Sequence, residues 1–104
     1  MVSSRDFVNL SKYCFHDNKH IIAARACPNF EYNTSDEIIR AENGPSGYII
    51  TPISENQCRL VCLINVNLKG WLPQYLIDQT LSMVQVDFIT ELRKYINKVQ
   101  DSLV

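Results

Sequence analysis

The feature that most constrains this chain is a long apolar stripe in its last third. Its residues recur every three or four positions, which is the spacing of one face of an α-helix. They are Ile77, Leu81, Val84, Phe88, Leu92, Tyr95 and Val99, widened by Met83, Ile89, Ile96 and Leu103. Pro73 suits the first turn of a helix, where the missing N–H would have no partner. The pattern predicts a helix of roughly thirty residues, about 45 Å long, that begins near Pro73.

A stripe of this width has two interpretations. Most such stripes are ordinary core packing, in which a helix covers the apolar side of its own domain. Alternatively, part of the stripe lines a site for an apolar ligand, because ligand sites are mainly apolar with a few polar groups. Periodicity alone favours core packing, so the ligand hypothesis needs support from elsewhere in the chain.

The chain before the helix has the pattern of short β-strands. Five segments with alternating, β-branched or aromatic residues predict strands: Arg5–Phe15, His20–Ala26, Glu37–Glu42, Tyr48–Ile53 and Cys58–Leu68. Polar turns and one loop separate them: His16–Lys19, Cys27–Asp36, Asn43–Gly47 and Ser54–Gln57. In the last strand every second residue from Cys58 is apolar, which is typical of a strand with one covered face. Antiparallel strands before one terminal helix predict an α+β fold, with the helix lying across a curved sheet.

Composition fits one small soluble domain. The chain has 104 residues, of which 46% are hydrophobic and 20% charged, and its formal net charge is −1. It has no block of like charges, which argues against nucleic-acid binding because phosphates require a basic face. No segment has the roughly 20 apolar residues of a membrane span, and no apolar leader follows Met1. We therefore expect a soluble, cytoplasmic chain whose four cysteines are buried free thiols.

The sequence shows no catalytic or metal-binding pattern. Residues 44–47 (GPSG) fall short of a G-x-S-x-G nucleophile elbow, because Tyr48 stands where the second glycine is required. His16 and His20 lie on a predicted turn and strand rather than on one helix face, and no third ligand has suitable spacing. We expect no catalytic residue, no metal and no cofactor.

Charged neighbours in the first half of the chain have a structural interpretation. We expect Arg5 to pair with Asp6, and Arg40 with Glu42, as fold-stabilising ion pairs. None of these residues is a candidate catalyst.

Three segments together resemble a known family. They are "SRDFVN" at residues 4–9, "IIRAENGPSGYIITP" at 38–52 and "VNLKGWLPQYLIDQTLSMVQVDFITELRKYI" at 66–96. In this order and with these gaps, they resemble the C-terminal half of a START (StAR-related lipid transfer) domain. Within that family the similarity is greatest to the steroidogenic acute regulatory and late-endosomal sterol-handling subgroup.

The resemblance implies a fold and a function. START domains have a helix-grip fold, in which a curved antiparallel sheet wraps a long C-terminal helix and leaves a tunnel for one lipid. It implies a non-enzymatic carrier for a sterol, such as cholesterol, or for another single lipid. Such a carrier makes transient contact with a membrane surface, here mitochondrial or late-endosomal. Its helix stripe would then be partly core and partly tunnel wall.

The resemblance also assigns roles to residues of this chain. It places the following in contact with lipid: Ser11, Asn43, Ser46, Leu81, Val84, Phe88 and Leu92. The turn formed by His16, Asp17, Asn18 and Lys19 corresponds to the loop that gates the tunnel together with the helix. In the sterol-handling members an arginine paired with an acidic residue stands at the position of Ser11. Here that charge is replaced by a hydroxyl, which leaves the identity of the lipid open.

The resemblance covers only the second half of a START domain, from residue 1 to residue 104 as one domain. We therefore expect the chain to be a fragment of a longer protein. The alternative is a truncated product that does not transfer lipid. An unpaired sheet edge and an under-covered apolar helix would make such a product bind itself or another protein.

Overall fold

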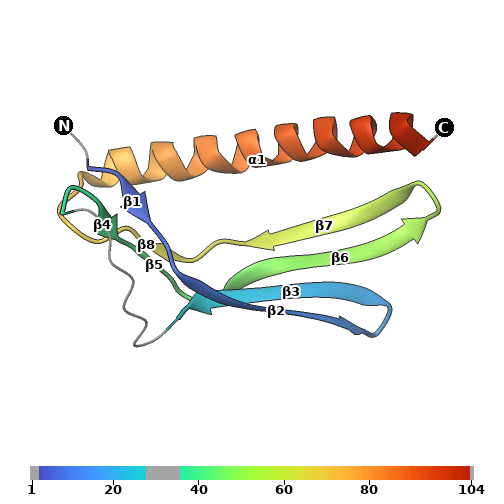
Figure 1. The fold of residues 1–104 in the computed structure, drawn as a ribbon, viewed down its shortest axis with the longest axis horizontal. Helices are drawn as coiled ribbons and strands as arrows, with labels where there is room; N and C mark the ends of the chain where they lie inside the picture. Colours follow the sequence, from blue (N-terminus) through green and yellow to red (C-terminus); the bar gives the residue numbers. More distant parts are fainter. Residues whose placement is uncertain (1–2, 28–35, 104) are drawn as a thin grey trace. The chain divides into compact units, whose positions relative to one another are not determined.

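The computed structural model describes residues 3–27 and 36–103. The chain divides into two compact units, residues 1–70 and 71–104, and each is described by itself. The first unit contains the strands and the second contains the helix α1 (Gln74–Leu103) (Figure 1). The strands are β1 (Arg5–Asp6), β2 (Asn9–His16), β3 (Lys19–Ala26), β4 (Ile39–Arg40), β5 (Glu42–Asn43), β6 (Ser46–Ser54), β7 (Gln57–Leu63) and β8 (Val66–Asn67). An antiparallel sheet and a long C-terminal helix confirm the predicted α+β class.

The main sheet of the first unit has four antiparallel strands in the order β2-β3-β6-β7. Its first hairpin closes at the pair His16 and Lys19, with Asp17 and Asn18 as the two turn residues. Both turn residues have positive φ, 52° and 59°, as a type I′ turn requires. Aspartate and asparagine adopt this conformation more readily than most residues, so the polar turn fits its sequence. The predicted turn is confirmed as a tight hairpin.

The remaining strands form two small pairs. The strand β1 runs parallel to β4, and β5 runs antiparallel to β8. Three predicted strands are therefore interrupted: Arg5–Phe15 between β1 and β2, Glu37–Glu42 at Ala41, and Cys58–Leu68 after Leu63. In each case the chain leaves one partner strand and pairs with another. The alternation of apolar and polar residues along the sequence does not indicate where a strand changes its partner strand.

Arginine side chains hold the small strand pairs together. The Arg5 guanidinium donates from Nε to Leu68 O at 3.0 Å and from Nη2 to Lys69 O at 2.9 Å. The half-buried Arg40 donates to both carboxylate oxygens of Asp6, at 2.6 and 3.2 Å. Two such parallel bonds make a bidentate pair.

The predicted ion pairs were wrong in their partners. Asp6 pairs with Arg40 rather than Arg5, and Glu42 pairs with Lys69 at 3.5 Å rather than with Arg40. The reason is the parallel pairing of β1 with β4, which sets Asp6 opposite Arg40. Sequence neighbours in a strand point to opposite faces and are poorly placed to meet.

The second unit is the helix α1, which has 30 residues. The N–H groups of Leu76 and Ile77 donate to Pro73 O at 3.1 and 3.3 Å, so the helix begins directly after Pro73 as predicted. Gln74 and Asp78 are hydrogen-bonded one turn apart, at 2.9 Å. In the described part of the chain, no helix combines the length and the apolar character needed to cross a membrane.

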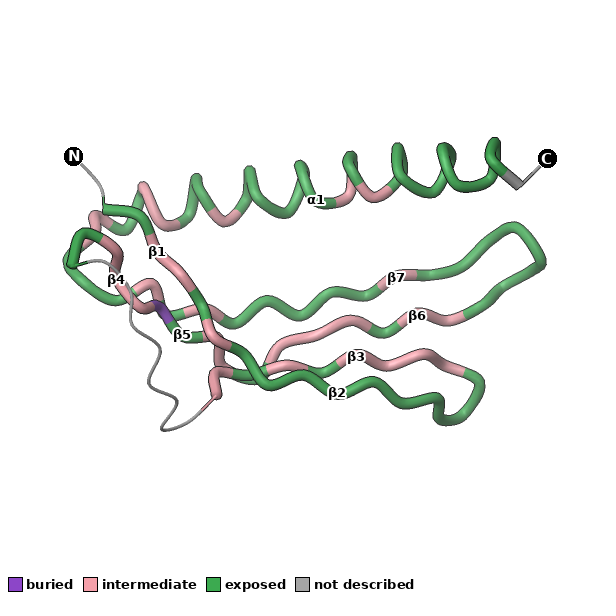
Figure 2. Tube along the Cα trace, viewed as in Figure 1, coloured by how far each residue is buried: buried purple, intermediate pink, exposed green. Residues whose placement is uncertain are grey.

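Among the described residues only Ala41 is buried (Figure 2). Large apolar side chains lie at the surface of both units, for example Tyr13 (58% exposed), Leu63 (61%) and Trp71 (86%). Exposed apolar surface on this scale usually marks a place where another molecule or another part of a protein binds.

The cysteines are free, as predicted, but the prediction that they are buried is wrong. Cys14, Cys58 and Cys62 are exposed, and Cys27 is half-buried. The reason is that β2 and β7, which carry three of them, are exposed along almost their whole length.

Replacing Gly47 with alanine is expected to destabilise the sheet. A Cβ at this position would overlap the carbonyl oxygen of Ile22 on the neighbouring strand, and backbone cannot move aside without breaking the β3–β6 pairing. The expected loss is about 1–3 kcal/mol of unfolding free energy, measured by thermal or urea unfolding.

Gly44→Ala is the matched control. The three atoms nearest to its Cβ all belong to the side-chain amide of Asn65, which can rotate away, so the loss should be smaller. Equal losses for the two variants would contradict the assigned role of Gly47.

Candidate functional site

The two faces of the main sheet differ in charge. Directly paired residues point to the same face, and successive residues point to opposite faces. One face, called the uncharged face below, contains no Asp, Glu, Lys or Arg. Its residues are Asn9, Ser11, Tyr13, Phe15, His20, Ile22, Ala24, Ala26, Ser46, Tyr48, Ile50, Pro52, Cys58, Leu60 and Cys62. All the Lys and Arg residues of these four strands lie on the other face.

The predicted polar site residues gather at one end of the uncharged face. Ser11 pairs with Ala24, and Ala24 pairs with Ser46, so the three lie in one row across β2, β3 and β6. Asn43 donates from Nδ2 to Asn9 Oδ1 at 3.0 Å, two residues before Ser11. The structure therefore brings Ser11, Asn43 and Ser46 into one region, as a shared site requires. Their contact with lipid remains a prediction.

The hydroxyl of Ser46 has a structural role. It lies 3.1 Å from Gly44 O and 3.2 Å from Asn65 O, which share its proton, and it accepts the Asn65 N–H at 3.1 Å. It thereby ties the start of β6 to the residue where the chain leaves β7. One lone pair is left for any ligand. By contrast, Ser11 is exposed on β2.

A second polar group lies further along the uncharged face, and the sequence analysis missed it. The hydroxyl of Tyr13 and Nδ1 of His20 are 2.6 Å apart, and the two rings are stacked with centroids 5.9 Å apart. Phe15 packs against the same imidazole with centroids 4.9 Å apart. The sequence feature that could have predicted this group is the two-residue turn. Such a turn fixes the hairpin register, and that register sets Phe15 opposite His20.

The predicted gating residues lie at the tip of the β2–β3 hairpin. His16 and Lys19 are paired strand ends, and only Asp17 and Asn18 form the turn. All four are therefore held by the hairpin, and their gating role remains a prediction.

The predicted lipid-facing residues of the helix share one side of α1. Leu81, Val84, Phe88 and Leu92 are separated by three or four residues, so they form a single stripe. Val84 is 55% exposed and Phe88 is 40% exposed. Val86 is 66% exposed but lies between them in sequence and therefore on another side of the helix. The helix presents one continuous apolar side, and its contact with lipid remains a prediction.

The polar groups of the uncharged face are suited to hydrogen bonding with a ligand. They are hydroxyl, amide, phenol and imidazole groups that can donate or accept one or two hydrogen bonds. Within residues 3–27 and 36–103, no three His, Cys, Asp or Glu side chains are grouped as a metal site would need. An apolar surface with a few hydrogen-bonding groups matches a ligand that is itself mainly apolar with a few polar groups.

Comparison with known proteins supports one family. The family model described as START domain matches residues 1–102. The mitochondrial steroidogenic acute regulatory proteins of Equus caballus and Homo sapiens are 36% and 35% identical to the chain over 96 residues. These matches cover 90% of this chain and 34% of each relative. The chain thus spans about a third of the length of the curated relatives it matches.

A solved structure has the same fold. Human StAR-related lipid transfer protein 5 superposes with a TM-score of 0.78, at 24% sequence identity, over 86% of this chain and 44% of that chain. At 24% identity this similarity supports the fold alone.

Ser46→Ala is expected to lower stability, because it leaves the Asn65 N–H without its acceptor. A loss of about 1–2 kcal/mol of unfolding free energy follows from the removal of such a bridging hydroxyl. Chemical denaturation measures it.

Ser11→Ala is the control, since this exposed hydroxyl lies on the same face and in the same row. It should change stability little. A loss for Ser11→Ala as large as that for Ser46→Ala would show that the bridging bonds are not the cause.

Proposed function

The chain belongs to the START domain family, and on that premise we propose that it forms part of a carrier that binds one lipid, most simply a sterol, and transfers it between membranes. The family membership and fold class confirm the resemblance seen in the sequence. The observation that carries the proposal is the uncharged face of the main sheet. The apolar stripe of α1 is a second surface of the same character.

A sterol is nearly all hydrocarbon with a single hydroxyl. Burying about 400 Å² of its surface provides roughly 10 kcal/mol of gross driving force, before the costs of ordering ligand and protein. A charged side chain on the binding surface would oppose this, because it would lose its water without gaining a partner. A surface without Asp, Glu, Lys or Arg meets that requirement across four strands.

The lipid hydroxyl needs one or two hydrogen-bond partners. The pair Asn9 and Asn43 lies at one end of the uncharged face, and the pair Tyr13 and His20 lies further along it. Ser11, which replaces the arginine of the sterol-handling members, adds a hydroxyl without adding a charge. With no Asp, Glu, Lys or Arg among them, these groups favour a neutral lipid over a fatty acid or a phospholipid head group.

Transfer requires the lipid to enter and leave at a membrane. We propose that the His16–Lys19 hairpin tip and α1 move during loading, with no covalent chemistry. The relatives named above are mitochondrial by name, which supports a mitochondrial membrane as the site of action. The late-endosomal surface is the other possibility given by the resemblance.

A second candidate function rests on the open edges of the main sheet. Its outer strands β2 and β7 each have one partner among the described strands, and β2 is exposed along its length. Unpaired strand edges promote pairing with another chain. The protein would then be an interaction or self-associating module that does not transfer lipid.

Phe88→Asp tests the lipid hypothesis. It places a charge on the apolar stripe, so binding of a fluorescent sterol should weaken about tenfold or more, from loss of the buried ring and the cost of burying a charge. Fluorescence titration measures the affinity, and native mass spectrometry gives the stoichiometry.

Val86→Asp is the matched control, because it adds the same charge to an exposed apolar position on another side of the same helix. It should bind as the unchanged protein does. Equal binding by the two variants would refute the stripe as a lipid surface. Concentration-dependent oligomers without bound lipid would favour the second candidate.

A further inference from the structure

The face opposite the uncharged face is strongly basic. The register places Lys12, Lys19, Arg25 and Arg59 on this side, together with His16 and no Asp or Glu. We call it the basic face. The acidic residues of the two hairpins, Asp17 and Glu55, lie in their turns at one end of the sheet. The chain has a net charge of −1, so this concentration of cations is local and does not follow from composition.

The cations of the basic face have no partner within the described residues. The other cations of the first unit are all bound: Arg5 donates to backbone carbonyls, Arg40 pairs with Asp6 and Lys69 pairs with Glu42. No described ion pair or side-chain hydrogen bond involves the four cations of the basic face. Repulsion between unpaired like charges is unfavourable unless an outside anion compensates it.

Apolar side chains lie between these cations. Leu10 is 55% exposed, Ile49 39%, Val61 50% and Leu63 61%, and all point to the basic face. An acidic protein partner would match the charges but would need its own complementary apolar shape. A bilayer offers both components without a fixed shape, since anionic head groups lie directly above hydrocarbon.

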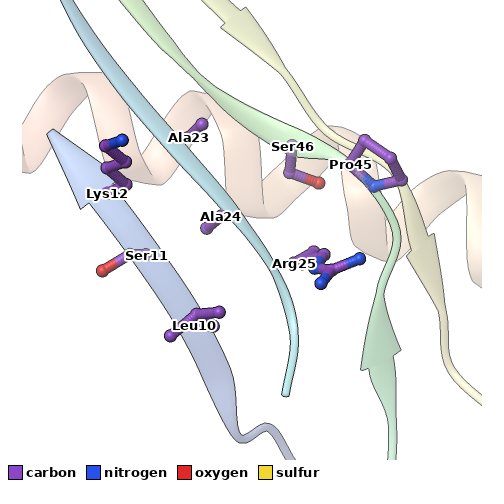
Figure 3. Close-up of a pocket in the computed structure, with 8 residues that line it drawn as sticks. All are labelled: Leu10, Ser11, Lys12, Ala23, Ala24, Arg25, Pro45 and Ser46. Atoms are coloured by element: carbon purple, nitrogen blue, oxygen red, sulfur yellow. The ribbon is translucent and has the colours of Figure 1, made fainter. Parts of the chain in front are cut away.

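A hollow of about 260 Å³ lies beside Lys12 and Arg25, at the Leu10 end of β2 (Figure 3). Its lining comes from both faces of the sheet. The basic face contributes Leu10, Lys12, Ala23 and Arg25, the uncharged face contributes Ser11, Ala24 and Ser46, and Pro45 comes from the segment before β6. Lys12 pairs with Ala23 and Leu10 pairs with Arg25, so the side chains of these four residues share the basic face. Lys12 and Arg25 therefore each place a cation beside apolar side chains on the basic face.

We propose that the basic face is a docking surface for membranes containing anionic lipid. The cations attract the head groups, and the apolar side chains between them contact the outer part of the bilayer. Charge is therefore divided between the two sides of one sheet, with anionic lipid on one side and neutral cargo on the other. The role of this docking in lipid transfer rests on the proposed function, whereas the docking itself does not.

The test is flotation of the protein with vesicles of phosphatidylcholine and with vesicles that also contain phosphatidylserine. The unchanged protein should bind the anionic vesicles preferentially, and added salt should weaken that binding. The double variant Lys12→Gln with Arg25→Gln should bind them roughly tenfold more weakly or worse, as expected for the loss of two cations at an anionic surface.

The matched control is Arg93→Gln with Lys98→Gln, which removes the same net charge from exposed positions on α1. It should keep its vesicle binding. Equal losses for the two double variants would overturn the proposal, because net charge alone would then explain binding. Equal binding to the two kinds of vesicle, or no binding to either, would also overturn it.

Three further measurements separate the ways in which this test could fail. Arg59→Gln, on β7 at the far side of the same face, should also weaken vesicle binding, so the result does not depend on one variant. Binding to polyglutamate but not to anionic vesicles would indicate an acidic protein partner and overturn the lipid proposal. Sterol titration in solution should be unchanged in the Lys12/Arg25 variant, whereas Phe88→Asp should lose sterol and keep vesicle binding.

Discussion

Strand register is the constraint on which both surfaces of the main sheet depend. Because side chains alternate along a strand, a slip of one residue in β2 would exchange Lys12 for Ser11 on the basic face. The Asp17–Asn18 turn prevents the slip, since its two positive φ angles fix a two-residue hairpin. The register continues to β6 through Gly47, where the carbonyl of Ile22 leaves no room for a larger residue. Local turn chemistry therefore determines where the charges lie.

Much of the fold was predictable from sequence because it depends on local patterns. The helix start after Pro73, the hairpin turn and the α+β class each follow from spacing or from turn residues within a short window. The broken strands were not predictable in this way. The chain leaves β7 after Leu63, and the Ser46 hydroxyl there binds the backbone of Asn65, which is 19 positions away in sequence. The pairing of Asp6 with Arg40 spans 34 positions and arises from the parallel β1–β4 contact.

The candidate site also has residues that could be predicted from local sequence patterns and residues that could not. The helix stripe, including Leu81 and Phe88, is a periodic signal and could be found from sequence alone. Ser11, Asn43 and Ser46 were identified through resemblance, and the structure shows that they lie in one region. The Tyr13–His20 pair was missed because the two residues are seven positions apart and meet only across the hairpin. The two residues can be identified as partners only once the register of β2 and β3 is known.

A carrier of neutral lipid has to satisfy two opposing electrostatic demands. It must hold its cargo on a surface without uncompensated charge, since desolvating a charge costs more than the burial of one apolar side chain provides. It must also reach a membrane, where attraction to anionic head groups is the longest-ranged force available. A β-sheet can meet both demands with one set of strands, because alternate residues face opposite ways. Ser11 and Lys12 are an example at adjacent positions, because the Ser11 hydroxyl lies on the uncharged face and the Lys12 cation lies on the basic face.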